Sequence, residues 1–334
     1  MFTDKTMIIM KKILTLVLAL VASVSLWALD TDTDGYYLLG SVQDWQDFAA
    51  IVETTPNVNA RMTADIDLGD DQTTAGTSSK RFQGIFDGQG HTLTINLTAT
   101  DSYYGLFRYI DGASIQSLHI TGSITTSFRF VGGLVGATYG ICNFTNCRSS
   151  VRVKTSYAGD GVQGGFVSCL LEGSQNFNDC LFDGVLDGKN AQTWGCFVGW
   201  SYGHVISLSN CLVLCDDFTV SMSYVSTFVS GSGSSYTNCY YKTAIGTAQG
   251  TQATEEQLAD GTIAAALQNG RAEEIWVQDP VLHTPMLKIF VKSSTPTAID
   301  NTSISTKAIK RIVNGQLLIE KNGKLYNATG AEVK

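Results

Sequence analysis

A short glycine-containing phrase returns four times along the middle of the chain at a nearly constant interval. It reads GGLVG at 132–136, GGFVS at 164–168, GCFVG at 195–199 and STFVS at 226–230. Its second residue is Gly133, Gly165, Cys196 and Thr227 in turn, which gives spacings of 32, 31 and 31 residues. A period of about 20 to 50 residues is typical of stacked units, because no single unit buries its apolar face alone. The glycines are therefore predicted to be scaffold. A phosphate-binding loop, the alternative, needs a Lys and a following helical pattern, and neither follows here.

Each copy of the phrase is followed by a second anchor, an Asn or Asp directly before a Cys. The anchors are Asn146-Cys147, Asp179-Cys180, Asn210-Cys211 and Asn238-Cys239. A weaker, earlier copy has Gly105-Leu106 at its opening and Leu118 in the place of the cysteine. Residues that recur at one place in stacked units lie above one another, so the four cysteines are predicted to form one interior column. The residues before them are expected at a corner, where amide side chains can form a ladder.

The pattern within each unit is that of short strands. Val151 and Val153 flank Arg152, and Asp-Gly pairs at 87–88, 111–112, 183–184 and 187–188 supply turns. Only 16% of the residues are charged, against about 25% in typical globular domains, and 33 are glycine. We therefore expect an all-β chain that folds as a right-handed β-helix of about five or six coils, with neighbouring coils about 4.8 Å apart. Short capping helices and a small C-terminal β-hairpin tail complete the prediction.

Eight cysteines allow three interpretations. Recurrence at one position favours reduced core residues, and disulfides between stacked neighbours remain open because the coil spacing suits the required Cα separation. A zinc site is disfavoured, because the other four cysteines show no CxxC spacing and no nearby pair of histidines. They are Cys142, Cys169, Cys196 and Cys215. Neither a metal nor a cofactor is predicted.

Both ends of a solenoid need a cap. Val42, Trp45, Phe48, Ala49 and Val52 have helical spacing, which predicts a short helix over the first coil. A second helix is predicted to start with the capping-box pattern of 254–257 and to end at Gly270 after Asn269.

The recurring phrases resemble the GLUG repeat of bacterial surface and secreted proteins. The segment ARMTADIDLG with RFQGIFDGQGHTLTINL (60–97) resembles the start of such β-helical proteins, and 254–287 is similar to the module that closes such repeats in Bacteroidetes. The resemblance, together with composition, implies an N-terminal cap segment at 29–75, repeats at 76–245, a closing module at 246–291, a linker at 292–308 and a β tail at 309–334.

The first 28 residues have the order of a secretory signal peptide, with Lys11-Lys12, the apolar run 13–26 and Ala28 at the expected cleavage site. A membrane anchor is the alternative, but a span needs about 20 apolar residues and acidic residues follow too soon. The mature chain is expected to have no transmembrane span. Residues 1–28 carry +2 of the net charge of −8, so the rest carries −10, which argues against a nucleic-acid partner.

The tail IKRIVNGQLLIEKNGKLYNATGAEVK (309–334) alternates like three short strands separated by Asn-Gly and Thr-Gly pairs. It resembles the C-terminal sorting signal of the Bacteroidetes type IX secretion system, which implies the secretion machinery as a partner. A simple hairpin tail is the alternative. The expected location is secreted or on the outer-membrane cell surface.

No catalytic site is predicted. The four histidines lack the HExxH spacing, and no G-x-S-x-G pattern occurs. The best acidic pair is Asp216-Asp217, with His204 and Lys189 one coil away, but adjacent residues of a strand point to opposite faces.

Aromatic residues are spread through the repeats and could form a surface that packs on sugar rings. Trp200 and Tyr202 are the first candidates, followed by Trp194 and Tyr139. The predicted function is that of an adhesin-like, non-catalytic repeat protein that binds glycan or host or matrix protein. The alternatives are a polysaccharide lyase or glycoside hydrolase that uses Asp216 and Asp217, and a structural spacer of the cell surface.

Overall fold

The structure, a computed structural model, describes residues 29–188, 190–220 and 223–291 and the strands of a C-terminal sheet. One unit ends at Val291, and a second lies within 292–334. The predicted signal peptide and linker lie outside the described residues. No helix of the described residues is long and apolar enough to cross a membrane.

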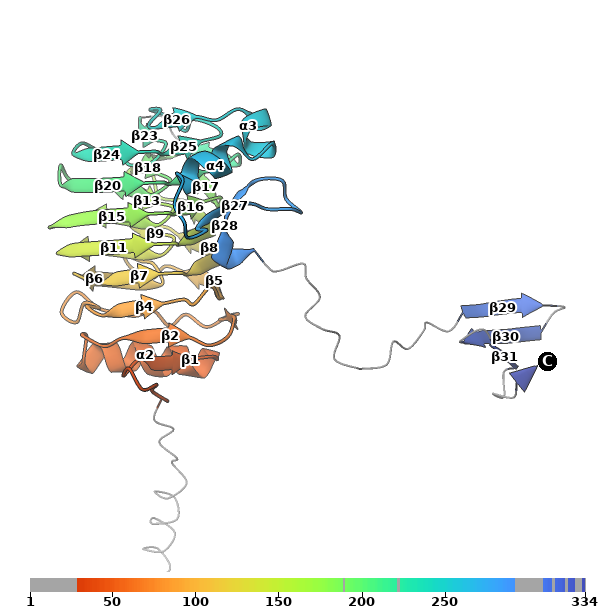
Figure 1. Cartoon of the computed structure of the whole chain (residues 1–334). Helices are drawn as coiled ribbons and strands as arrows, with labels where there is room; N and C mark the ends of the chain where they lie inside the picture. The colour runs from red at the N-terminus through yellow and green to blue at the C-terminus, as the bar shows by residue number, and fades with distance from the viewer. Residues whose placement is uncertain are drawn as a thin grey trace, which may run out of the picture. The chain divides into compact units, whose positions relative to one another are not determined.

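The first unit is a β-solenoid of about six turns, which confirms the predicted fold class (Figure 1). Its strands stack in four parallel sheets. Sheet A contains β1 (Tyr37–Leu39), β2 (Ala60–Met62), β4 (Ile85–Asp87), β7 (Ser114–Gln116), β11 (Ile141–Thr145), β15 (Ser174–Asn178), β20 (Val205–Ser209) and β24 (Ser234–Thr237). Sheet B contains β3 (Ile66–Asp67), β5 (Thr92–Thr98), β8 (His119–Thr126), β12 (Arg148–Thr155), β16 (Leu181–Phe182), β17 (Val185–Gly188), β21 (Leu212–Val213), β22 (Phe218–Val220), β25 (Tyr240–Tyr241) and β26 (Thr251–Gln252).

Two shorter sheets complete the coil. Sheet C contains β6 (Phe107–Asp111), β10 (Val135–Tyr139), β14 (Val167–Leu170) and β19 (Val198–Trp200). Sheet D contains β9 (Phe130–Gly132), β13 (Gly159–Gly164), β18 (Ala191–Gly195) and β23 (Tyr224–Ser226). In the central coils the chain passes through sheets C, A, B and D in turn. Each residue therefore lies beside its counterpart about 31 residues away, as Phe144 pairs with Phe177 and Phe177 with Leu208.

The four recurring cysteines form one buried column inside the solenoid. Each precedes a residue of sheet B that pairs with its counterpart in the next coil, and each thiol donates to a carbonyl oxygen of the preceding coil at 3.4–3.5 Å. All eight cysteines are free and buried. Burial raises the pKa of Cys180 well above its usual value. The four cysteines of the column are at most 3% exposed and therefore pack as small core side chains.

The residue before each cysteine has a left-handed backbone conformation, which turns the chain from sheet A to sheet B. The φ angles of Asn146, Asp179, Asn210 and Asn238 are 53° to 54°. Asn tolerates this region better than most residues, which explains its recurrence. The Asn238 side-chain amide donates to Asn210 Oδ1 at 2.8 Å, so part of the corner is an amide ladder.

The glycines of the phrase lie where the chain turns sharply from sheet D to sheet C. A Cβ on Gly133 would lie 2.2 Å from the carbonyl oxygen of Gly165 in the next coil. In later copies, serine replaces the last glycine of the phrase. The Ser168 hydroxyl donates to the carbonyl of Val162 at 3.1 Å, so the substitution satisfies a backbone group.

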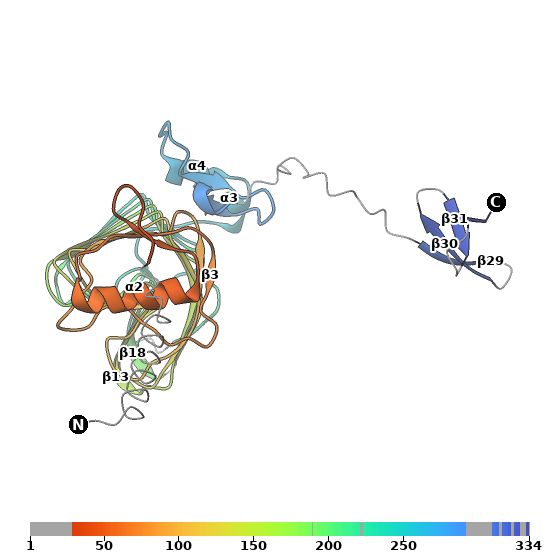
Figure 2. The same cartoon turned by 90° about the horizontal axis from the view of Figure 1, so that it is seen from below.

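The predicted N-terminal helix is confirmed as α2 (Val42–Thr54), which lies across the first coil (Figure 2). Ser41 caps its first turn by accepting from the Asp44 N–H at 3.2 Å. Trp45, Phe48 and Val52 are fully buried, and Trp45 packs edge-on against Phe107 at 5.6 Å. The helix therefore shields the end of the apolar core from water.

The closing module differs from the prediction in two respects. Two helices, α3 (Glu255–Ala259) and α4 (Thr262–Gln268), replace the single one, because Gly261 has φ +88° and breaks the helix after the Thr254 capping box. The module also covers the side of the solenoid rather than its end (Figure 2). Leu181 and Leu212 of sheet B pack against Leu258, Leu267, Trp276 and other apolar residues of the module. Its last elements are the antiparallel strands β27 (Trp276–Gln278) and β28 (Pro285–Leu287) and the 3-10 turn η1 (Lys288–Phe290).

The second unit is an antiparallel sheet of four strands, one more than predicted. They are β29 (Ile309–Val313), β30 (Gln316–Lys321), β31 (Lys324–Asn327) and β32 (Glu332–Val333), and each pairs with the next. The short segment after Thr329-Gly330 adds the fourth strand. The turn residues themselves lie outside the described residues.

Candidate functional site

At the turn between sheets D and C, apolar side chains lie on both faces of the coil, some toward the main core and some away from it. Leu134, Phe166, Phe197 and Phe228, at the middle of each phrase, belong to the main core. A separate apolar cluster forms on the faces of sheets C and D that point away from the main core. The strands β13 and β18 of sheet D lie on the side of the coil away from α3 and α4 (Figure 2). We call it the outer cluster and include the exposed aromatics that adjoin it. Its members are Tyr103, Tyr109, Phe130, Ala137, Tyr139, Val162, Cys169, Leu171, Trp200, Tyr202 and Tyr224.

The cluster is a consequence of the register of sheet C. The residues four positions after the second residue of each phrase pair from coil to coil: Tyr109, Ala137, Cys169 and Trp200. Trp200 contacts two exposed tyrosines, with ring centroids 6.3 Å from Tyr202 and 6.3 Å from Tyr224 and both rings nearly perpendicular to the indole. At the other end Tyr103 stacks on Phe130 at 4.6 Å. Aromatic groups therefore define both ends of the cluster.

The surroundings of the cluster are electrically balanced. Arg81 lies over the Tyr139 ring at 3.5 Å and pairs with Asp111 at 3.3 Å. The same arrangement recurs twice. Arg108 lies near Tyr109 and pairs with Asp101, and Arg129 lies over Phe130 and pairs with Asp160. Each cation is thus held by a ring and a carboxylate, which leaves no unpaired charge among these three groups.

The phenol groups of Tyr103, Tyr109 and Tyr202 stay protonated well above neutral pH. Burial raises the pKa of Tyr103 to about 12, and burial also raises the pKa of Tyr109 and Tyr202. Their hydroxyls therefore act as neutral hydrogen-bond donors and acceptors over the physiological range.

An open pocket of about 400 Å³ lies at the end of the cluster near the last coil. Trp200 and Tyr224 form its aromatic walls, and Ser223, Ser226, Ser230 and Thr247 add hydroxyl groups. The Ser230 hydroxyl donates to the Tyr224 carbonyl at 2.9 Å, which fixes the backbone beside that ring. Among the described residues that line the pocket, the Tyr224 phenol is the one ionisable group.

Of the four predicted binding residues, Trp200 and Tyr202 are in contact, and Trp200 lines the pocket. Tyr139 also belongs to the cluster, near Tyr103 and with Arg81 over its ring. Trp194 does not, because its indole is completely buried and donates to the Ala191 carbonyl at 3.1 Å. It offers no surface to a ligand, and its alternate position in the strand places it on the inner face. Tyr103, Tyr109 and Tyr224 belong to the same cluster and are among the aromatic residues of the repeats, but they were not selected as candidates from the sequence. The constant offset of Tyr109 and Trp200 from the phrase was the available signal.

The acidic pair of the enzyme alternative does not converge on one site. Asp216 accepts from Lys242 Nζ at 2.5 Å and from the Thr243 hydroxyl, whereas Asp217 pairs with Arg152 at 3.0 Å. Both aspartates are exposed, and Lys189 lies outside the described residues. Among the described residues, no three His, Cys, Asp or Glu side chains are grouped so that they could hold a metal ion.

A polar network on sheet B was not expected from the sequence. His119 Nε2 lies 2.9 Å from the Ser150 hydroxyl, and that hydroxyl donates to Asp183 Oδ1 at 2.5 Å. Arg148 donates to the same carboxylate, and the Phe290 ring packs 5.7 Å from the His119 ring. The serine lies between the histidine and the aspartate, so the histidine is not oriented by the carboxylate as a general base would be. The network is best explained as a link between coils beneath the closing module.

Comparisons with known proteins establish the fold alone. No family model matches the chain, and no curated protein matches it. A crystal structure from Bacteroides ovatus, described as a "putative immunoglobulin A1 protease", aligns with a TM-score of 0.51 at 14% identity. The alignment covers 78% of this chain and 94% of that chain. The shared property is the β-solenoid architecture, and a fold of this kind does not specify a function.

Proposed function

We propose that the chain is an exported, non-catalytic, adhesin-like solenoid of the GLUG-repeat type that binds glycan through the outer cluster. The observation that carries the proposal is the grouping of Trp200, Tyr202 and Tyr224 beside a pocket lined with hydroxyl groups. Aromatic rings pack against the apolar faces of sugar rings, and neighbouring hydroxyls bond to sugar hydroxyls. Tyr202 and Tyr224 are 46% and 58% exposed, so their ring faces are accessible without a conformational change.

The tail is proposed to direct export to the cell surface by the type IX route, as its resemblance implies. A host or matrix protein partner would then be recognised through its glycans. The lyase or hydrolase alternative is less favoured, because Asp216 and Asp217 are each engaged in separate surface ion pairs. The name of the Bacteroides ovatus neighbour suggests a protease, but a likeness at 14% identity carries no catalytic residues to this chain.

The test is a glycan array and a panel of matrix proteins probed with the purified chain, its Trp200→Ala variant and its Val205→Ala variant. Val205 is 58% exposed on sheet A, so its truncation is the matched control. We expect binding by the parent and the control and loss of binding by Trp200→Ala with the fold intact by circular dichroism. Binding that survives Trp200→Ala would contradict the proposal. A depolymerisation assay on the bound glycans accompanies the array, and turnover there would contradict the non-catalytic assignment.

A further inference from the structure

The column that contains Trp200 ends in a glycine at the pocket. Counting four residues from the second position of each phrase gives Tyr109, Ala137, Cys169, Trp200 and, in the last copy, Gly231. Gly231 lines the pocket with a φ of +101°, and a Cβ there would lie 2.5 Å from the Ser201 hydroxyl, so this position does not accommodate a further side chain. The wall of the outer cluster is therefore interrupted in its last coil, directly beside its largest ring.

The pocket is limited at the end of the solenoid by a firmly held segment. Thr247 lines the pocket, and its backbone bonds to Val225 and Thr227 at 2.8 and 3.0 Å. Two residues later, the Gln249 side chain accepts from the N–H groups of Phe228 and Val229 and donates to the Val229 carbonyl. The amide thus takes the place of a further strand on sheet C. A wall built in this way is firmly held, because the Thr247 backbone and the Gln249 side-chain amide are bonded to the last coil.

Toward the other end of the cluster, Ala137 and Cys169 are completely buried, whereas Tyr103, Tyr109 and Leu171 are partly exposed and form its surface. From Trp200 the outer cluster continues for three coil spacings to Tyr109, a distance of about 14 Å at about 4.8 Å per coil. Tyr202 lies on this path, and Tyr103 stands at its far end against Phe130. A ligand held in the pocket can therefore extend along the solenoid axis in one direction only.

The charges around the pocket limit the class of ligand that it can bind. The pocket is lined by hydroxyl groups and aromatic rings, and each arginine beside the outer cluster is paired with an aspartate. A carboxylate or sulfate would lose its hydration without meeting a free cation. Uncharged sugar rings avoid this penalty.

We propose that the pocket receives the terminal ring of an uncharged oligosaccharide, whose following rings lie along the solenoid axis against Tyr202 and toward Tyr103. This inference rests on the proposed glycan-binding function and specifies it. The protein would then recognise the ends of oligosaccharides rather than their internal rings. Truncation of Tyr202 should weaken long oligosaccharides more than disaccharides, because the second and later rings contact it.

The experiment measures binding of cellohexaose, mannohexaose and xylohexaose as neutral probes, their disaccharides, and hexagalacturonate as the acidic probe. The variants are Thr247→Trp, which fills the pocket from an exposed lining position, and Thr247→Glu, which adds a charge there. Thr237→Trp and Thr237→Glu, on the exposed outer face of sheet A, are the controls. We expect a neutral probe, or the neutral glycan found on the array, to bind both pocket variants about tenfold more weakly than the parent, which equals about 1.4 kcal/mol. Its binding to the two control variants should equal that of the parent.

The outcomes separate the two proposals. If glycan binding depends on Trp200 but is unchanged in both Thr247 variants, the pocket does not bind the terminal ring, and this inference is wrong while the proposed function remains. The same holds if hexagalacturonate binds better than every neutral hexasaccharide. If no glycan on the array binds the parent protein, the proposed function itself is wrong. Circular dichroism and thermal unfolding establish that each variant is folded before its binding is compared.

Discussion

The outer faces of sheets A and B are built by the same coils, yet they differ in charge and in exposure. Between β7 and β24, the outward residues of sheet A include no ionisable side chain. They are Ser114, Gln116, Ile141, Asn143, Thr145, Ser174, Asn176, Asn178, Val205, Ser207, Ser209, Ser235 and Thr237. The outer face of sheet B carries Arg148, Arg152, Asp183 and Asp187, which form ion pairs between coils.

The two faces also differ in what lies against them. Ile141 and Val205, at the start of their strands in sheet A, are 63% and 58% exposed. Leu181 and Leu212, at the start of their strands in sheet B, are completely buried under the closing module. One apolar residue per coil at a strand start therefore does not define a docking surface. Sheet B differs because the Asn/Asp corner beside it bonds to the module. Asp179 accepts from Arg271, and the Asn238 amide donates to the Ala266 carbonyl.

The largest expected difference between the faces is in the cost of truncating these apolar residues. Leu212→Ala leaves a cavity between sheet B and the module and should lower the free energy of unfolding by about 2–5 kcal/mol. Val205→Ala removes an exposed side chain and should change it by less than about 0.5 kcal/mol. Urea unfolding of both variants measures the difference. Equal effects would mean that the module contributes little to the stability of the solenoid.

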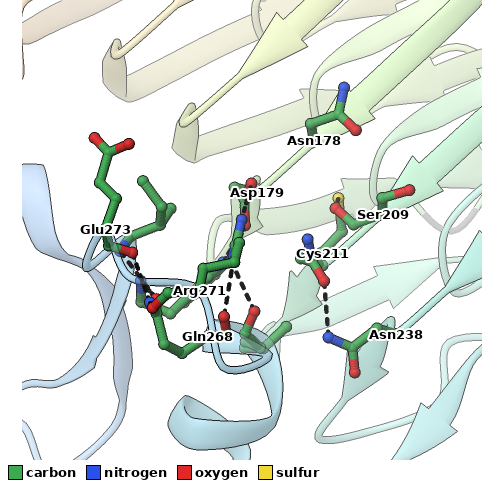
Figure 3. Close-up of polar contacts among 12 residues, drawn as sticks. Asn178, Asp179, Ser209, Cys211, Asn238, Gln268, Arg271 and Glu273 are labelled. Carbon is green, nitrogen blue, oxygen red and sulfur yellow. Dashed lines mark hydrogen bonds and ion pairs between the residues drawn. The ribbon is translucent and has the colours of Figure 1, made fainter.

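The next effect concerns Asp179, the one acidic residue in the Asn corner. It accepts two hydrogen bonds from Arg271 at 2.8 Å (Figure 3) and one from Trp276 Nε1 at 2.9 Å. Asp179→Ala leaves these donors unpaired and should cost about 2–4 kcal/mol. Asp179→Asn keeps the left-handed corner and an acceptor, so it should cost less. If Asp179→Asn were as damaging as Asp179→Ala by thermal unfolding, the charge rather than the hydrogen bonds would hold the module.

The coils and the corners could be predicted from the sequence because one period governs both. An interval of about 31 residues puts Gly133 beside Gly165 and each anchor cysteine beside the next, whatever the details of the turns. The corners could be predicted because the preference of Asn for a left-handed turn is a local property of the backbone. The candidate site followed in part, because Trp200 lies at the end of a strand whose alternation shows its outward position, whereas Tyr202 lies in the turn after that strand, with φ 51°.

The position of the closing module could not be predicted from the period. A capping box identifies where α3 begins but carries no information on which surface its apolar side contacts. The decisive contact joins Asp179 to Arg271 across 92 residues, and a single Asp in a row of Asn is a weak signal. Trp194 was misassigned for a similar reason. An aromatic residue beside a glycine corner can fill the core or the outer surface, and only the register separates the two.

The third prediction uses pH, because the outer face of sheet B contains a buried titratable group and that of sheet A does not between β7 and β24. Burial, with a smaller contribution from Arg148, lowers the pKa of His119 to about 4. Asp183 and Asp65 oppose the shift, and Phe290 packs on the ring. Below pH 6.5 the unfolded chain binds a proton that the folded chain refuses, so stability is present above pH 6.5 and is lost as the pH falls toward 4.

Between pH 7.5 and pH 5 this loss should be about 2 kcal/mol, at about 1.4 kcal/mol per pH unit below 6.5. The His119→Gln variant isolates it, because carboxylates elsewhere titrate equally in both chains. Chemical unfolding at the two pH values should show a smaller pH dependence for His119→Gln. Parallel curves for the two chains would mean that His119 is protonated without disturbing the contact with Phe290.

The smallest effect is expected for the amide ladder of sheet A. Asn176 Nδ2 donates to Asn143 Oδ1 at 3.0 Å, and both side chains are partly exposed. Water can replace this bond on either side, so Asn176→Ala should lower stability by about 0.5–1 kcal/mol. Ser174→Ala, one position along the same face, is the control and should have a smaller effect. A loss above about 2 kcal/mol for Asn176→Ala would show that the ladder is cooperative from coil to coil. The two faces would then be held with similar strength, one by its amides and the other by the module that covers it.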